Sequence, residues 1–111
     1  MLRRSHTAVL EKNEVFTENF ETEPYETGWA CEAIWFVRVL EATPGTKLVA
    51  HAQVSPDGLF WCDKGDAPLS LEGEGLVHLP LRDFGGWLRL RCELKGERPS
   101  AKVLIYLFLK E

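Results

Sequence analysis

The sequence predicts an all-β protein, an antiparallel β-sandwich of jelly-roll-like architecture with roughly six to eight short strands. Short apolar segments rich in β-branched and aromatic residues recur along the chain, and Gly and Pro separate them. No segment shows a convincing amphipathic helical period. At 111 residues the chain has the size of one domain. We expect a flexible arm at residues 1–7 and a single sandwich domain at residues 8–111.

The N-terminal half is expected to form a strand at residues 8–20, a central strand at residues 33–40 and a half-buried strand at residues 48–54. The second of these is apolar on both faces, which is typical of an enclosed strand, whereas the third alternates. Residues 55–58, which read Ser-Pro-Asp-Gly, predict a hairpin turn because Pro presets φ and Gly accepts a positive φ. Residues 59–62 should begin the return strand.

The C-terminal half is expected to add three strands. Residues 76–81 contain Pro80, which lacks a backbone donor and therefore belongs at a sheet edge. Residues 103–109 are apolar on both faces. Residues 88–94 alternate most regularly, and their inward set consists of Leu88, Leu90, Cys92 and Leu94.

Charge and composition narrow the classes of partner. The chain carries 13 basic and 17 acidic residues, which argues against nucleic acid because phosphate binding needs a concentrated basic face. No apolar run reaches the roughly 18 residues of a membrane span, and the N-terminus lacks the apolar stretch of a signal peptide. The three cysteines cannot all pair within the chain. These features predict a cytoplasmic protein without a membrane partner.

The motifs give little support for catalysis or metal binding. The spacing of the possible soft metal ligands along the chain does not preassemble a zinc site. These ligands are Cys31, Cys62, Cys92, His51 and His78. A nucleophile also needs a base within hydrogen-bond reach, which only tertiary proximity of a histidine to a cysteine could supply. We expect no enzyme, no metal and no cofactor. A small enzyme built from His51 or His78 and a cysteine is a third alternative.

Acidic side chains gather in two segments that are expected to be loops. Calcium takes about six to eight oxygen ligands, and neither segment has the regular spacing of a calcium-binding loop. Solvated loops are the favoured interpretation, and calcium binding is left open. The acidic residues concerned are Glu18, Glu21, Glu23, Glu26, Asp57, Asp63 and Asp66.

The last predicted strand is the best indication of a role. One face of this strand can cover the core and is formed by Val103, Ile105, Leu107 and Leu109. The opposite face is also apolar and is formed by Leu104, Tyr106 and Phe108. Three large side chains buried at an interface would each contribute roughly 1.5–3 kcal/mol. Either a second subunit covers this face or the N-terminal segment does so with Phe16 and Phe20. We favour a homo-oligomer whose interface contains Leu104, Tyr106 and Phe108.

The aromatic residues suggest an alternative function. Trp35 lies in a strand that is apolar on both faces and is expected in the core, and Trp61 is expected to plug the hairpin. Trp29 and Trp87 stand beside glycines at the boundaries between turns and strands. Together with Tyr25 they could stack on sugar rings. The alternative to a structural or protein-interaction module is therefore a carbohydrate-binding module.

Two resemblances accompany this reading. The segment Ser55-Pro56-Asp57-Gly58-Leu59-Phe60-Trp61 resembles the S-x-D-G-x-x-W hairpin of discoidin-like (coagulation factor 5/8 type C) sandwiches and related carbohydrate-binding modules. There the Trp packs beneath the hairpin, so the resemblance implies a structural part. Residues 23–30, the hairpin, residues 86–91 and residues 107–111 together look similar to small bacterial domains of unknown function, which imply no functional residues.

Overall fold

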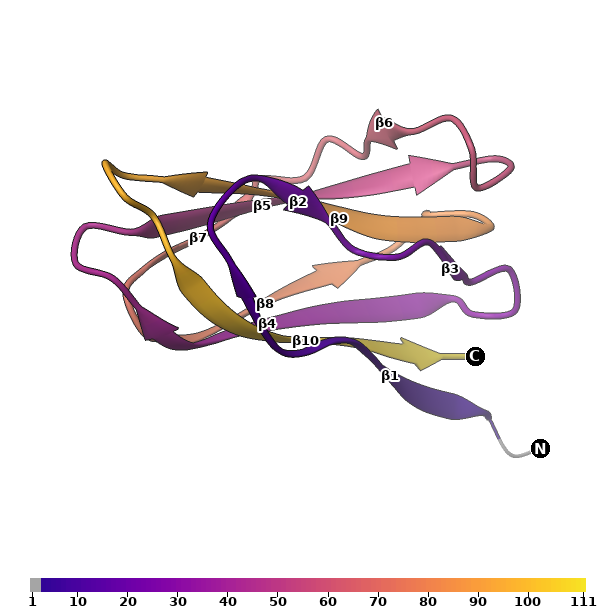
Figure 1. Cartoon of the computed structure of the whole chain (residues 1–111). Helices are drawn as coiled ribbons and strands as arrows, with labels where there is room; N and C mark the ends of the chain where they lie inside the picture. The colour runs from indigo at the N-terminus through magenta and orange to yellow at the C-terminus, as the bar shows by residue number, and fades with distance from the viewer. Residues whose placement is uncertain (1–2) are drawn as a thin grey trace.

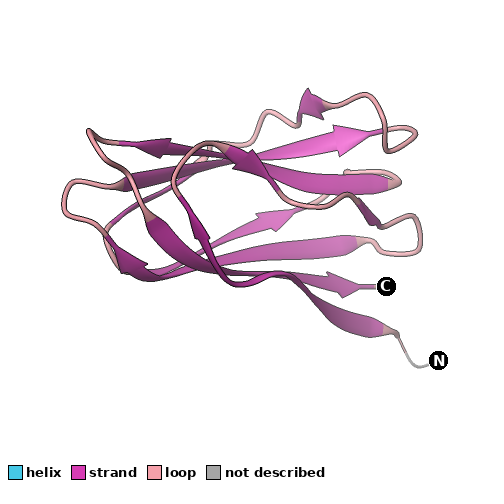
Figure 2. Cartoon of the chain, in the orientation of Figure 1, coloured by secondary structure: helices cyan, strands magenta, loops and turns pink. Residues whose placement is uncertain are grey.

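The computed structural model describes residues 3–111 and contains ten strands and no helix within them (Figures 1 and 2). Six of the strands have seven residues or more, and four have two to four. In chain order they are β1 (Ser5–Phe16), β2 (Phe20–Glu21), β3 (Tyr25–Glu26), β4 (Glu32–Ala42), β5 (Lys47–Ser55), β6 (Cys62–Asp63), β7 (Leu69–Glu72), β8 (Gly75–Leu81), β9 (Trp87–Lys95) and β10 (Ala101–Lys110).

The strands form two antiparallel sheets that lie face to face (Figure 1). Sheet A has the order β1-β10-β4-β8. In sheet B, β9 and β5 form the centre, β2 and β3 pair with β9, and β6 and β7 pair with β5. When β2–β3 and β6–β7 are each counted as one interrupted strand, the topology is that of an eight-stranded jelly roll. The predicted fold class is therefore confirmed.

The core lies between the inward faces of the two sheets. Trp35 and Val37 of β4 and Ile105 of β10 are fully buried against Leu88 and Leu90 of β9. The alternation predicted for residues 88–94 is confirmed, because Leu88, Leu90, Cys92 and Leu94 are all buried. Strand β10 lies between β1 and β4, so its inward set is enclosed along its whole length.

Two parts of the chain differ from the expected strands. Strand β1 begins at Ser5, within the segment 1–7 for which the sequence predicted a flexible arm, and residues 1 and 2 lie outside the described part. The return strand predicted at residues 59–62 is wrong except for Cys62, where β6 begins. The carboxylate of Asp57 accepts the backbone N–H groups of Leu59 at 2.9 Å and Phe60 at 3.1 Å, which holds both residues in the turn.

Both edges of sheet A are poor templates for another strand. The register between β1 and β10 shifts twice, between Val9 and Glu11 and between Lys12 and Glu14, and such bulges interrupt the ladder. At the other edge β8 carries Pro80, which has no N–H to donate. The prediction of an edge position for Pro80 is confirmed. Bulges and prolines at edges disfavour growth by strand addition.

Candidate functional site

The outward face of sheet A carries apolar side chains on all four of its strands. Along β10, Val103, Ile105, Leu107 and Leu109 are buried, while the alternate residues Leu104, Tyr106 and Phe108 are only partly buried. Because successive side chains of a strand point to opposite faces, these three residues lie on the outside of the sandwich. The sequence-predicted residues therefore share one face.

Neighbouring strands extend this face in register. Phe108 lies opposite Ile34, and Tyr106 lies opposite Phe36. Directly paired residues of an antiparallel ladder point to the same side, so each pair forms part of a row across the sheet. The apolar face, as defined here, consists of Val9, Ile34, Phe36, Leu76, Pro80, Leu104, Tyr106 and Phe108. Val9 and Leu76, at its two edges, are 51% and 61% exposed.

Charged residues border the apolar face at both ends, and the exposed Arg38 of β4 lies within it, between Leu104 and Leu76. Lys110 pairs with Glu32 at one end, and Lys102 pairs with Glu41 at the other. Glu32 accepts a hydrogen bond from Arg82 at 3.2 Å. Lys102, Lys110 and Glu41 form no ion pair within residues 3–111. Each end of the face therefore presents both signs of charge.

From residue 3 onward the N-terminal segment does not cover the apolar face, and the alternative that Phe16 and Phe20 do so is wrong. Phe16 lies opposite the buried Ala101 at the inward side of β10. Its ring stacks on that of Phe20, with centroids 3.7 Å apart and planes inclined by 8°. Both rings pack against the core cluster between the sheets. Phe20 is buried and Phe16 is partly buried, both on the opposite side of sheet A from the apolar face.

The three residues predicted as a stacking platform each have an internal neighbour. The ring of Tyr25 stacks with His6 at 6.4 Å, and the guanidinium of Arg4 lies 4.9 Å from the ring centroid of Trp29. Trp87 packs against the hairpin, where a Cβ at Gly58 would lie 3.2 Å from the indole. One side of each ring is therefore occupied by another part of the chain.

The hairpin also corrects the role expected for Trp61. The ring beneath the turn belongs to Trp87, which follows a different loop, whereas the guanidinium of Arg89 lies 4.5 Å from the ring centroid of Trp61. The turn has its own hydrogen bonds: Ser55 Oγ accepts the N–H groups of Asp57 and Gly58. The local sequence motif identified the turn, but not the side chain that packs below it.

The histidines and cysteines are dispersed. His51 Nε2 lies 2.9 Å from Glu93 Oε1 on the outward face of sheet B, while Cys92 of the same sheet faces the core, where burial raises the pKa of its thiol. Cys31 and Cys62 are free and exposed. Within residues 3–111 no group of three or more His, Cys, Asp or Glu side chains could hold a metal ion.

The carboxylates of the second acidic segment have partners in the fold. Asp57 caps the hairpin, and the N–H groups of Leu59 and Phe60 lower its pKa below the ordinary 3.8. Asp63 accepts hydrogen bonds from Gln53 at 2.9 Å and Arg91 at 3.3 Å. Asp66 pairs with Lys64 at 2.9 Å. The three carboxylates thus stabilise separate local structures.

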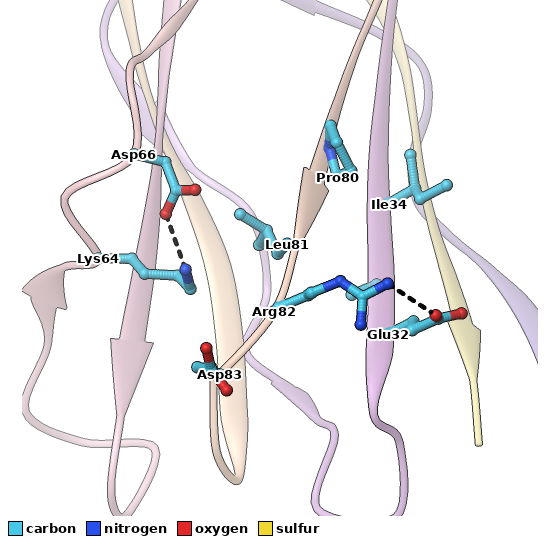
Figure 3. Close-up of a pocket in the computed structure, with 9 residues that line it drawn as sticks. Glu32, Ile34, Lys64, Asp66, Pro80, Leu81, Arg82 and Asp83 are labelled. Carbon is cyan, nitrogen blue, oxygen red and sulfur yellow. Dashed lines mark hydrogen bonds and ion pairs between the residues drawn. The ribbon is translucent and has the colours of Figure 1, made fainter.

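A pocket of about 500 Å³ lies at the end of β8 (Figure 3). Leu81 lies between two ion pairs in this view: Lys64 with Asp66 on one side, and Arg82 with Glu32 on the other. Both basic groups are therefore engaged by carboxylates of the same chain. The pocket offers charged and apolar walls but pairs no nucleophile with a base.

Sequence reasoning missed most of the apolar face. It identified the three residues of β10, but Ile34 and Phe36 were assigned only to a strand that is apolar on both sides, and Val9 and Leu76 were not singled out. The signal that they belong together is register, which depends on long-range pairing. The bulge that begins after Val9 shifts the alternation of β1, so its outward residues do not follow a period of two.

Comparison with known proteins gives evidence on the fold. No family model matches the chain, and no curated protein matches it. Among solved structures, it is similar to the structure of the infectious bursal disease virus Gx strain, with a TM-score of 0.64 and 12% identity over 97% of this chain and 32% of that one. A family two carbohydrate esterase from Cellvibrio japonicus aligns with a TM-score of 0.44 and 11% identity, over 98% of this chain and 34% of that one.

The chain spans about a third of the length of both of these proteins. At 12% identity the likeness to the viral structure shows the fold alone, and the alignment with the esterase carries no argument. The chain belongs, by topology, to the class of antiparallel jelly-roll β-sandwiches. Within residues 3–111 no helix is long and apolar enough to cross a membrane.

Proposed function

We propose that the protein is a non-catalytic structural or interaction module that pairs with a second copy of itself through the apolar face of sheet A. The observation that carries this proposal is the set of in-register apolar rows on the outside of the sandwich, where Tyr106 and Phe108 of β10 meet Phe36 and Ile34 of β4. Large contiguous apolar surfaces of this kind mark interaction sites in soluble proteins.

The size of the face fits a weak, reversible pair. Four strands about 4.8 Å apart, over roughly seven residues of about 3.4 Å each, span a projected area of about 450 Å². Two copies would bury about 900 Å², near the lower limit of specific interfaces at about 1,000 Å². We therefore expect a dissociation constant in the micromolar range, about −8 kcal/mol or weaker in binding free energy.

The charges around the face favour a second copy over a partner of uniform charge. The end that carries Lys110 also carries Glu32, and the end that carries Lys102 also carries Glu41. A copy presents the same mixture, so the two rims can meet with opposite charges close together. A strongly acidic or basic partner would place like charges together at both ends.

The edges of sheet A support packing through the face. A strand added at an edge needs a continuous row of free N–H and C=O groups. The bulges in β1 and Pro80 in β8 interrupt these rows. Face packing needs no such row, since it depends on side chains that interdigitate between two sheets about 10 Å apart.

Equilibrium sedimentation over about 1–100 µM, a range chosen to bracket the expected affinity, tests the proposal. The natural chain should shift from monomer to dimer, and Phe108→Asp should remain a monomer. Leu104→Arg provides a second disruptive variant. Phe60→Asp is the matched control, because Phe60 is 76% exposed on the hairpin of sheet B and should leave the dimer intact. A natural chain that stays monomeric throughout would contradict the proposal.

The carbohydrate-binding alternative is tested by tryptophan fluorescence in the presence of sugars. A sugar that stacked on Trp29, Trp87 or Tyr25 would change tryptophan fluorescence, and this change should be lost when the stacked residue is replaced. The internal neighbours of all three rings reduce the area open to a sugar. Self-association is therefore the better supported proposal.

A further inference from the structure

We infer that self-association through the apolar face is regulated by pH, and that His78 is the residue that senses it. This inference rests on the proposed function, because it concerns the same surface. Histidine is the side chain that ordinarily gains its charge between pH 5 and pH 8. A histidine within an apolar contact surface therefore couples proton binding to association.

The position of His78 places it in the central row of the face. It lies on β8 directly opposite Phe36 of β4, and Phe36 is opposite Tyr106 of β10. Tyr106 in turn pairs with Val9 of β1. The rings of His78 and Phe36 are 6.1 Å apart between centroids and inclined by 32°. The other three members of this row are apolar or aromatic.

The adjoining rows offer no free carboxylate to an imidazolium. One row contains Pro80, Ile34 and Phe108, and the other contains Leu76, Arg38 and Leu104, with Lys12 opposite Leu104. The nearest carboxylates are Glu32 and Glu41 in the end rows, of which Glu32 is engaged by Arg82, and Glu74, which precedes β8 and lines a pocket with Arg38 and Leu76. A second copy brings the same rows. A protonated His78 would therefore add positive charge close to Arg38, which lies in the next row on the adjacent strand.

The sign of the effect follows from the cost of burying charge. Moving an ionised group out of water is unfavourable without a counter-charge, so the dimer takes His78 in its neutral form. At alkaline pH that form is present and association is unhindered. As the pH falls, protonation favours the monomer, in which the ring stays in water. A symmetric dimer contains two copies of His78, so both contribute to the loss.

Sedimentation equilibrium at about pH 8 and about pH 5.5, on either side of the ordinary histidine range, tests this inference. We expect the dissociation constant of the natural chain to rise at least about tenfold at the lower pH. His78→Gln and His78→Phe, which stay neutral, should change less than about twofold between the two conditions. His51→Gln is the matched control: His51 lies on the outward face of sheet B, so this variant should keep the full response. Far-ultraviolet circular dichroism confirms folding at both pH values.

The possible failures are distinguishable. A dimer of equal affinity at both pH values would overturn the inference and leave the proposed function intact. A pH response that persists in His78→Gln and His78→Phe would also overturn it, since another group would then be responsible. A natural chain that is monomeric at both pH values would overturn the proposed function itself.

Discussion

At the scale of single residues, the hairpin between β5 and β6 shows how a short motif determines a local structure. Ser55, Asp57 and the backbone form a set of hydrogen bonds between 2.8 and 3.2 Å. Gly58 adopts a φ of +80° and packs on the indole of Trp87. The sequence predicts the turn because Pro, Asp and Gly have local preferences. It does not predict the contact with Trp87, which is 29 positions later in the chain.

Replacement of Gly58 by Ala should destabilise the protein for two reasons, and a second glycine separates them. Gly45 also has a φ of +80°, but no atom beyond its two chain neighbours lies within 4 Å of the position of its Cβ. Both substitutions force a side chain into the left-handed region, at a cost of about 1 kcal/mol. Only Gly58→Ala also displaces the Trp87 ring. Urea unfolding should therefore show a larger loss for Gly58→Ala, and equal losses would contradict the packing.

The capping role of Asp57 predicts a dependence of stability on pH. Its pKa is lowered from 3.8 because the carboxylate accepts N–H groups from Leu59 and Phe60. A group whose pKa is lower in the folded state contributes stability above its unfolded pKa, and loses it as the pH falls through the folded value. The urea midpoint of the natural chain should therefore drop more steeply below about pH 4 than that of Asp57→Asn. Identical profiles would show that the cap does not contribute.

At the scale of strands, prediction succeeded where the pattern was long and regular. The segments 33–40, 88–94 and 103–109 lie within β4, β9 and β10. The two-residue strands β2, β3 and β6 are too short to show a period, since alternation needs about four residues to be recognised. Their pairing depends on the long neighbouring strands β9 and β5. The composition of the apolar face was missed for the same reason, because register is a property of pairs.

Strand β10 provides an internal comparison of its two faces. Leu107 is fully buried in the core, whereas Leu104 is on the apolar face and only partly buried. Leu107→Ala should cost about 2–5 kcal/mol because it removes core contacts and leaves a cavity. Leu104→Ala should cost less than about 1 kcal/mol in the monomer, measured by urea unfolding at low concentration. A similar loss for both variants would contradict the assigned faces.

At the scale of the whole molecule, the two outward faces of the sandwich differ in character. On sheet B the outward side chains form a connected polar set, in which Arg89 donates to Gln53 at 2.7 Å and Arg91 donates to Asp63 and Glu93. His51 adjoins Glu93 in the same set. On sheet A the corresponding surface is mainly apolar. The sequence indicated this difference, through alternating Arg and Leu in β9 and continuous apolar residues in β10.

The polar set on sheet B has a consequence for stoichiometry. Its charged groups already form hydrogen bonds and ion pairs with one another and remain hydrated. Stacking a third subunit there would remove that hydration at a cost in free energy and would bury few apolar side chains. Association through sheet A uses the same patch on each partner and is closed by a two-fold axis. Stacking of a third subunit on the outward face of sheet B is therefore disfavoured, and the proposed assembly closes at two members through sheet A.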